Sequence, residues 1–219
     1  MNDRPVNPPK TLDQIAIECG TDKNSQCHAY TKYYEFFFEP IRFKELNVLE
    51  VGIYNGDSLR MWREYFPNAM IYGADIQDSS RYNEERIKTF ICDQSSKTAL
   101  MIARAQLPFM SLIVEDGSHQ SKDQILTFEM LWSLLSPGGF YVIEDTLCDS
   151  FSQWNGGEPT PTLNRVRQMI GEVDMNGKVD QNFLCSNKRQ EREKYQLTEF
   201  EHEIEFVFKS CGLVIIKKL

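Results

Sequence analysis

The chain has 219 residues, of which 41% are hydrophobic and 26% are charged, and its formal net charge is −8. These proportions are typical of a globular protein and exclude a disordered or collagen-like chain. No apolar run approaches the roughly 20 residues needed to cross a bilayer, and the acidic balance disfavours a nucleic-acid partner. The sequence therefore predicts a cytoplasmic protein whose partner is neither a membrane nor a nucleic acid.

The N-terminal part of the chain predicts a short lead-in followed by two helices. Residues 1–10 are polar and rich in proline, which predicts a flexible segment. From Thr11 to Cys19 the apolar residues keep helical spacing, and a second helix is expected from Tyr30 to Glu39, where aromatic residues are dense. Residues 11–45 are therefore expected to form N-terminal helices, whose exposed aromatic surface favours a homo-oligomer.

The middle of the chain alternates short apolar runs with helical patterns. Helices are expected over residues 58–66, 97–105 and 123–135, and a turn over residues 137–139. Strands that alternate with helices form parallel sheets with right-handed crossovers. Five buried strands are expected, at Asn47–Val51, Met70–Ala74, Thr89–Cys92, Ser111–Glu115 and Phe140–Ile143.

The C-terminal part departs from this alternation. Two apolar runs flank a short turn at Cys211-Gly212 and predict an antiparallel hairpin within residues 199–219. Before it lies a long polar segment, residues 146–198, and a connection of this size is typical of a lid or an acceptor-binding segment. We therefore predict one α/β domain over residues 11–219, with a mostly parallel, Rossmann-like sheet and helices on both of its faces.

A glycine-rich loop follows the first expected strand. Glu50, Gly52 and Gly56 fit the pattern E-x-G-x-x-x-G rather than the dinucleotide pattern G-x-G-x-x-G. The glycines let the backbone approach a ligand closely, and a carboxylate in place of the first glycine suits a cationic ligand better than a pyrophosphate. Ser58 is expected to cap the helix that follows. An ordinary loop glycine is the alternative for Gly52 taken alone.

Acidic residues also end the second and third expected strands. Asp75 follows Gly52 at the spacing where a carboxylate holds both hydroxyls of a ribose. Asp93 and Gln94 close the third strand and are placed to receive an adenine ring and its amine. Because the carboxyl ends of parallel strands meet at one edge, these residues point to S-adenosylmethionine, an adenosine with a sulfonium-bearing tail. The alternative is a set of surface acids beside a loop glycine.

A second acidic group follows the fourth and fifth expected strands. Asp116 ends the fourth strand and Glu144 with Asp145 ends the fifth, so three carboxylates are expected at one edge. Three oxygen ligands without a nearby cysteine suit Mg²⁺, Mn²⁺ or Ca²⁺ rather than zinc. His119 could then act as general base on a metal-bound hydroxyl, with a helix-capping or surface histidine as the alternative. Together these residues predict methyl transfer to an alcohol.

Several motifs resemble one family in their order and spacing. They are Gly20-Thr-Asp-Lys23 with His28 and Tyr30, Leu49–Gly52, Trp62–Pro67, Asp93-Gln94, Asp116–His119 and Tyr141–Asp145. The chain thereby resembles the metal-dependent macrolide-sugar O-methyltransferases of the mycinamicin and tylosin type, with the cephalosporin-hydroxylase-like proteins as relatives. The resemblance covers residues 11–146 and the hairpin. It implies a class I methyltransferase fold, S-adenosylmethionine and Mg²⁺ as cofactors, and a sugar hydroxyl of a natural product as acceptor in antibiotic biosynthesis.

The resemblance also implies roles for single residues. Asp116, Glu144 and Asp145 are then the metal ligands and His119 the base, with Asp116 serving the metal, the cofactor and the reaction. Thr21, Lys23, His28 and Tyr30 are expected to line the entrance of the cleft or to form a capped turn. Some family members carry an extra N-terminal domain, for which this chain has no room. The expected cofactor site comprises Glu50, Gly52, Gly56, Ser58, Asp75, Asp93, Gln94 and Asp116.

Two other functions stay open. A catechol-type Mg²⁺-dependent O-methyltransferase acts on an aromatic diol, and a lysine base with an aromatic-lined lid would favour it. A cephalosporin-hydroxylase-like or cofactor-binding protein that kept only the fold is the other alternative. The set of Asp116, His119, Glu144 and Asp145 argues against that second alternative, and no site of two histidines and one carboxylate supplies a redox centre.

Overall fold

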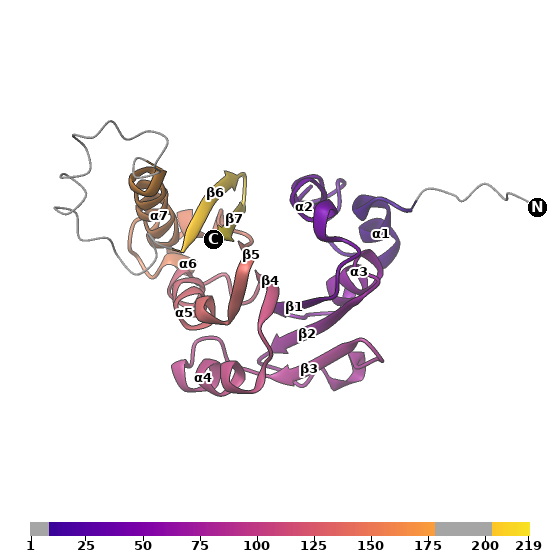
Figure 1. Ribbon diagram of the computed structural model, residues 1–219. Coiled ribbons are helices and arrows are strands. Elements are labelled where there is room, and N and C mark those ends of the chain that lie inside the picture. The colour runs from indigo at the N-terminus through magenta and orange to yellow at the C-terminus, as the bar shows by residue number, and fades with distance from the viewer. Residues whose placement is uncertain (1–8, 178–202) are drawn as a thin grey trace, which may run out of the picture.

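The computed structural model describes residues 9–177 and 203–219 and contains one sheet with helices packed on both faces (Figure 1). The strands are β1 (Leu46–Val51), β2 (Ala69–Asp75), β3 (Ile87–Ile91), β4 (Met110–Glu115), β5 (Leu135–Ile143), β6 (Ile204–Ser210) and β7 (Leu213–Lys218). The helices are α1 (Leu12–Cys19), α2 (Thr31–Phe38), α3 (Asp57–Tyr65), α4 (Lys97–Gln106), α5 (Ser121–Leu131), α6 (Ser152–Asn155) and α7 (Pro161–Gly177). The sheet order is β3-β2-β1-β4-β5-β7-β6.

The strand order changes direction between β1 and β4. The strands from β3 through β5 pair in parallel, β7 pairs antiparallel with β5, and β6 pairs antiparallel with β7. In open parallel sheets, ligands bind outside the carboxyl ends of the strands at such a switch point. The predicted parallel sheet and the predicted C-terminal hairpin are therefore confirmed.

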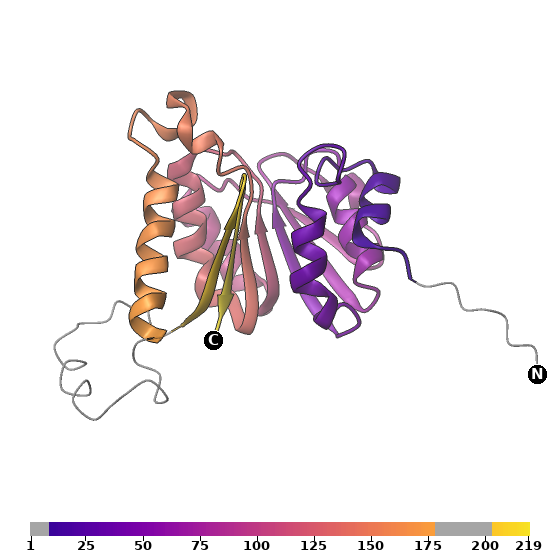
Figure 2. The same cartoon turned by 90° about the horizontal axis from the view of Figure 1, so that it is seen from above.

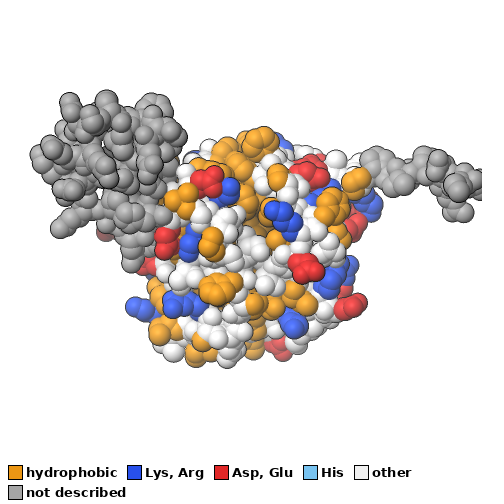
Figure 3. Space-filling view, viewed as in Figure 1, with side chains coloured by type: hydrophobic (Ala, Val, Ile, Leu, Met, Phe, Trp, Pro, Cys, Tyr) orange, Lys and Arg blue, Asp and Glu red, His pale blue; other side chains and the backbone are white. Residues whose placement is uncertain are grey.

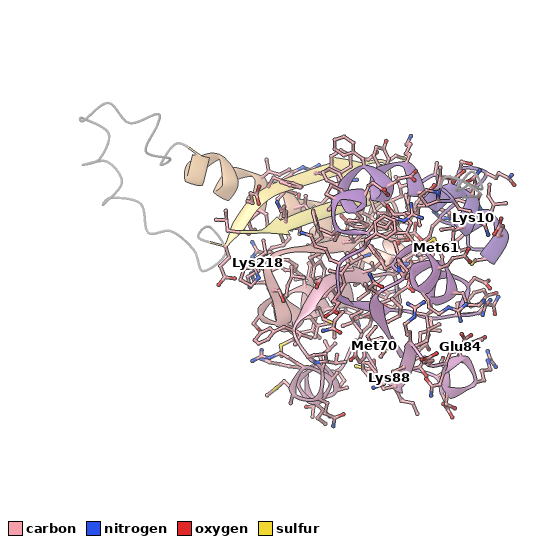
Figure 4. The ribbon with its side chains drawn as sticks, turned by 45° about the vertical axis from the view of Figure 1, so that its right-hand side comes forward. Lys10, Met61, Met70, Glu84, Lys88 and Lys218 are labelled. Carbon is pink, nitrogen blue, oxygen red and sulfur yellow. The ribbon has the colours of Figure 1, made fainter. Side chains whose placement is uncertain are left out.

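Alternating residues of the strands build two hydrophobic cores. On one face Val48 and Leu112 pack with α1, α2 and α3, and Met61 of α3, labelled in Figure 4, lies inside this core. On the other face Leu49 and Ile113 pack with α4, α5 and α7. The two groups of helices lie on opposite sides of the sheet (Figure 2). Because successive side chains point to opposite faces and both faces are covered, these strands appear in the sequence as continuous apolar runs.

The start of α1 explains how the N-terminal segment is held. Thr11 and Gln14 form a capping box at its first turn, and Gly20 ends it with a φ of +83°. Lys10, labelled in Figure 4, bonds to Glu64 of α3 at 3.1 Å. The chain after Gly20 turns toward the carboxyl ends of the strands, which brings Lys23 to the sheet edge.

The largest difference from the predicted boundaries lies between α5 and β5. The helix expected to run to Leu135 ends at Leu131, and β5 already begins at Leu135. Residues 137–139, which predicted a turn, lie within β5, where its pairing with β4 shifts register. Gly138 has a φ of +74°, a conformation that glycine adopts at little cost. The Pro-Gly-Gly sequence therefore interrupts the ladder without ending the strand.

The segment predicted as a lid, residues 146–198, contains a helix that supports the sheet. α7 packs against α5 and β6, and its residues Val166 and Met169 are buried. This helix therefore belongs to the layer on one face of the sheet. The rest of the segment after residue 177, and the predicted lead-in up to residue 8, lie outside the described residues, so the predicted domain limits stay a prediction.

The surface is mixed in character. Figure 3 shows acidic, basic and hydrophobic side chains interspersed on the face that it presents. In the aromatic run of α2, Phe38 is buried, whereas Phe36 is 76% exposed. The predicted homo-oligomer stays a prediction. Within residues 9–177 and 203–219, the helices are too short or too polar to span a bilayer.

Candidate functional site

A cleft of about 780 Å³ opens at the switch point of the sheet. The loops after β1, β2, β3, β4 and β5 form its walls together with residues 20–23, and its volume is typical of pockets that bind small molecules. Several aspartates line it, which favours a positively charged ligand. They are Asp22, Asp57, Asp75, Asp78, Asp93, Asp116, Asp123 and Asp145.

The loop after β1 requires both of its predicted glycines. Gly52 has a φ of +98°, and a Cβ there would lie 2.0 Å from the carbonyl oxygen of Asp116. Gly56 has a φ of +71°, and a Cβ there would lie 2.9 Å from the ring of Tyr82. The sequence predicted that these glycines allow a close approach of a ligand. The structure shows that Gly52 also allows the backbones after β1 and β4 to touch.

Asp75 and Asp93 line the cleft and are fixed by nearby donors. Asp75 accepts hydrogen bonds from the backbone N–H groups of Ile53 at 2.8 Å and Gln77 at 2.9 Å, on different oxygens. Asp93 accepts bonds from the hydroxyl and the backbone N–H of Ser95, which lower the pKa of this carboxyl group. A carboxylate has about four acceptor positions, so each can still accept bonds from a ligand.

Gln94 is bonded to the protein at both ends of its amide. Its Nε2 donates to Glu115 Oε1 at 2.9 Å, and its Oε1 accepts from the backbone N–H of Ser118 at 3.0 Å. A Cβ at Gly117 would lie 1.5 Å from this amide oxygen, so glycine makes room for it. The side chain that was predicted to receive adenine thus positions the loop that carries His119. Burial raises the pKa of Glu115 to about 8.

Three carboxylates converge on the ammonium of Lys23, and we term them the inner cluster: Glu50, Asp116 and Glu144. Lys23 Nζ lies 2.5 Å from Asp116 Oδ2, 2.8 Å from Glu144 Oε2 and 3.4 Å from Glu50 Oε1. One oxygen atom from each acid lies within 4.8 Å of the other two. Lys23 is only 1% exposed, a rare position for a lysine that has no ionic partner.

Hydroxyl groups complete the inner cluster. Ser58 donates to Glu50 Oε2 at 2.6 Å, and Tyr34 donates to Glu144 Oε1 at 2.5 Å. Burial opposes the charge on Lys23, but the carboxylates outweigh it and hold the pKa of Lys23 well above its usual range. Burial raises the pKa of Glu50 and Glu144, while Lys23 and the hydroxyl donors act in the opposite direction. Ser58 was predicted as a helix cap, but α3 begins without a side-chain cap.

Asp116 also belongs to a second group, which we term the outer cluster: Asp116, His119 and Asp145. One ligand atom from each of these residues lies within 4.8 Å of the other two. Their side chains line the cleft and are 21% to 28% exposed. His119 Nε2 lies 3.7 Å from Asp145 Oδ2. The outer cluster is therefore accessible to a ligand, whereas the inner cluster is almost closed.

The N-terminal segment also positions Asp145. Tyr30 donates its hydroxyl hydrogen to Asp145 Oδ1 at 2.7 Å, and His28 Nδ1 lies 3.1 Å from the same oxygen. Asp145 and His119 have positive φ angles, +51° and +56°, although neither is a glycine. This conformation costs roughly 1–2 kcal/mol per residue, and such strain concentrates at functional sites. The strained ends of β4 and β5 meet in the outer cluster.

The predicted metal ligands and the predicted base divide between the two clusters. Asp116 and Asp145 meet at the cleft with His119, whereas Glu144, the third predicted metal ligand, faces Lys23 and Tyr34. Sequence reasoning missed the role of Lys23. The signal for Lys23 was the Gly20-Thr-Asp-Lys23 motif, which is part of the resemblance to the family. Its spacing along the chain did not connect this motif to the strand ends. The burial of Glu115 was also not predicted, because in the sequence this acid is only the last residue of an apolar run.

Proteins with similar sequences are O-methyltransferases by name. The 8-demethyl-8-alpha-L-rhamnosyl tetracenomycin-C 2'-O-methyltransferase of Streptomyces olivaceus is 35% identical over 170 residues, which cover 74% of this chain and 45% of that protein. The demethylmacrocin O-methyltransferase of Streptomyces fradiae is 34% identical over 175 residues, 74% of this chain and 44% of that protein. The match thus spans less than half the length of these relatives. No protein-family model matches the chain.

A solved structure has the same fold. The MycE methyltransferase from the mycinamycin biosynthetic pathway, in complex with Mg and SAH, superposes with a TM-score of 0.84 at 25% identity, and the match covers 96% of this chain and 55% of that chain. The chain is a homologue of these methyltransferases. The resemblance seen in the sequence is thereby confirmed, and so is the class I methyltransferase fold.

Proposed function

We propose that this homologue is an S-adenosylmethionine-dependent O-methyltransferase that uses a divalent cation and acts on a sugar hydroxyl of a natural product. One observation carries the proposal: a single cleft joins Asp75 and Asp93, on the β2 and β3 side, to Asp116 and Asp145 of the outer cluster. Its relatives' names and the complex of MycE with Mg and SAH support the same reaction class.

The β1–β3 side of the cleft suits the cofactor. Asp75, held by the N–H of Ile53, would accept hydrogen bonds from the ribose hydroxyls, and Asp93, which lines the same cleft, would accept one from the adenine amine. The sulfonium carries a positive charge, which the aspartates of the wall stabilise. Gly52 and Gly56, both with positive φ, shape the loop after β1 on this side of the cleft. Glu50 is fully buried and would act through the hydrogen bond from Ser58 and the ion pair with Lys23 rather than by direct contact with the cofactor.

The outer cluster fits a hard divalent cation. Asp116 and Asp145 would hold it through carboxylate oxygens, the ligands that Mg²⁺ prefers. The two clusters contain more carboxylates than Lys23 can balance, and their excess negative charge attracts a cation. When bound, Mg²⁺ supplies Lewis-acid stabilisation to a substrate oxygen that gains negative charge.

His119 is placed to move the proton. The acceptor oxygen forms a bond to the methyl carbon as the carbon–sulfur bond breaks, the electron pair returns to sulfur, and the hydroxyl proton passes to His119. Asp145, 3.7 Å from His119 Nε2, stabilises the positive charge that the imidazole gains. The hydrogen bond that Gln94 accepts from the Ser118 backbone holds this loop in place, which reduces the entropy lost in reaching the reactive geometry.

The structure disfavours the catechol-type alternative with a lysine base. Among the described residues, Lys23 is the lysine that lines the cleft. Its ammonium contacts three carboxylates, which hold its pKa well above the usual range. A lysine that keeps its proton so firmly cannot accept another, so His119 is the base that the cleft offers.

Two measurements test the proposed function. The first is calorimetric binding of S-adenosylhomocysteine with and without Mg²⁺, for which we expect a dissociation constant in the micromolar range. The second is mass spectrometry of a panel of glycosylated natural products and catechols after incubation with S-adenosylmethionine. We expect Mg²⁺-dependent addition of one methyl group to a sugar. Failure to bind the nucleoside would refute the proposal, and methylation of catechols alone would favour the alternative.

A further inference from the structure

The two edges of the sheet are protected to different degrees. At the β3 edge, the backbone N–H of Thr89 donates to Asn83 Oδ1 at 2.7 Å, and Glu84 forms an isolated bridge with Ile87. At the opposite edge, β6 pairs with β7 on its inner side, and no other strand of residues 9–177 and 203–219 pairs with it (Figure 1). An uncovered edge strand offers a row of backbone N–H and C=O groups to another strand.

The sequence of β6 is self-complementary about Val207. Going outward from this residue, each direction has an aromatic residue and then a charged one, Phe206 and Glu205 on one side and Phe208 and Lys209 on the other. Two copies paired antiparallel about Val207 therefore place Phe206 of each copy opposite Phe208 of the other. They also place each Glu205 opposite a Lys209, and two-fold symmetry forms every such pair twice.

The two charged residues of this pairing are exposed and can reach a second copy. Lys209 forms no ion pair within the described part of the chain, and its Nζ donates to Thr146 Oγ1 at 3.1 Å and to the Ser210 carbonyl. Glu205 Oε2 lies 2.8 Å from Lys217 Nζ, and a carboxylate can accept further bonds. A lysine on an edge strand prevents self-pairing where it would face a like charge, but here it would face an acid.

Aromatic side chains extend along β6 on the side of α2. The ring centroid of Phe37 lies 5.4 Å from that of Phe206 and 5.1 Å from that of Phe208, and all three residues are partly exposed. Phe36 contacts Phe37 edge to face and is 76% exposed. A second copy at the β6 edge would bury part of this aromatic surface, which stabilises an interface.

We propose that the outer edge of β6 is a dimer interface, where a second copy of this chain pairs antiparallel about Val207 and continues the sheet. Main-chain hydrogen bonds supply the affinity, and the aromatic and charged pairs set the register. The three central residues of β6 lie where it pairs regularly with β7, because the register shift of β6 falls before Phe206. No residue of β6 or β7 lines the cleft, so the inference does not depend on the proposed function.

Sedimentation velocity over a range of protein concentrations tests the interface. We expect the native protein to form dimers with a dissociation constant of about 10 µM. Lys209→Glu should raise this constant by about 30-fold, because two attractive pairs become repulsive. Lys88→Glu is the matched control, since Lys88 is exposed on the β3 edge (Figure 4) and its substitution changes the net charge equally. The control should form dimers as the native protein does.

A charge exchange tests the register. Glu205→Lys combined with Lys209→Glu keeps the native net charge and again places opposite charges across the interface. We expect this double variant to regain a dissociation constant within about 3-fold of the native value. A double variant no better than Lys209→Glu alone would overturn the register. A native protein that is monomeric at about 200 µM, or a dimer that Lys209→Glu leaves unchanged, would overturn the interface.

Hydrogen exchange of the native protein decides the question without any variant. Protection of the β6 amides should rise with protein concentration, because pairing with a second copy closes their outer side. The β3 amides, whose edge is already covered, should exchange at the same rate at every concentration. If the β6 amides were equally protected at every concentration, another segment of the same chain would cover this edge, and the inference would fail.

Discussion

The inner and outer clusters share Asp116, but they differ in almost every physical property. The inner cluster surrounds Lys23, which is 1% exposed, and its acids accept further bonds from Ser58 and Tyr34. The outer cluster is 21% to 28% exposed, lines the cleft and contains two residues in a strained backbone conformation. Burial thus separates acids that look equivalent in the sequence into one group that holds the fold and one that is open to ligands.

The largest effect is expected from Asp145→Asn, which removes a charge from the outer cluster. Asparagine tolerates positive φ and can keep the bond from Tyr30, so the fold should be retained. We expect kcat/KM for methyl transfer to fall by about 10³-fold, because a metal ligand is lost. The unfolding temperature should change by less than about 3 °C. Full activity, measured in steady-state kinetics with saturating Mg²⁺, would remove Asp145 from the metal site.

The next largest effect is expected from His119→Asn. Asparagine again fits the φ of +56°, so the loop should keep its shape. We expect kcat to fall by about 10²-fold while binding of Mg²⁺ and S-adenosylhomocysteine stays the same, because a general base is lost but no ligand. His28→Asn is the matched control, since His28 contacts Asp145 as well, and it should lose less than about 10-fold. If His119→Asn lost Mg²⁺ binding, His119 would be a metal ligand instead.

The strand ends were predictable from the sequence because they depend on local patterns. Apolar runs that end in an acid, such as those before Asp75 and Asp116, identify the carboxyl edge of a parallel sheet, and the structure brings both acids to one cleft. The turn predicted at residues 137–139 was wrong because a glycine can interrupt a strand as well as end it.

The division into two clusters was not predictable, because it depends on contacts between distant parts of the chain. Lys23 reaches Asp116 across 93 residues and Glu144 across 121 residues. Apart from the Gly20-Thr-Asp-Lys23 motif, nothing in its own neighbourhood distinguishes it from a surface lysine. Gln94 likewise donates its amide hydrogen to Glu115 because the packing of the sheet brings the ends of β3 and β4 together. Its position after a strand does not predict this contact. Burial and pairing arise only when the elements pack.

Two tyrosines of the same helical region offer a matched test of the two clusters. Tyr34→Phe removes the hydroxyl from buried Glu144, and we expect it to lower the free energy of unfolding by about 2 kcal/mol without changing Mg²⁺ affinity. Tyr30→Phe removes the hydroxyl from Asp145 in the outer cluster. It should lower stability by less than about 1 kcal/mol but weaken Mg²⁺ binding by about 10-fold. Urea unfolding and calorimetry measure both quantities, and the opposite pattern would contradict the assignment.

The smallest effect on methyl transfer is expected from Glu115→Gln, which compares a buried acid that has a cation with one that does not. Glu115 is fully buried, accepts a bond from Gln94, and has no ion pair within the described part of the chain. Burial raises its pKa to about 8, from an ordinary value of 4.5. Between these two pH values the folded protein binds more protons than the unfolded chain does. Its stability therefore falls as the pH rises, by up to roughly 1.4 kcal/mol per pH unit from this one group.

Glutamine cannot ionise and can accept the same bond from Gln94, so Glu115→Gln should lose this pH dependence. We expect the two proteins to be about equally stable near pH 5 and the variant to be the more stable one near pH 8, because only the native acid is then forced to ionise in a buried site. Urea unfolding at several pH values measures the difference in stability between the two proteins. A chelator in the buffer prevents cation binding at the outer cluster from contributing to it. Parallel curves would mean that Glu115 keeps its charge in the fold. The contrast between paired and unpaired buried acids would then vanish.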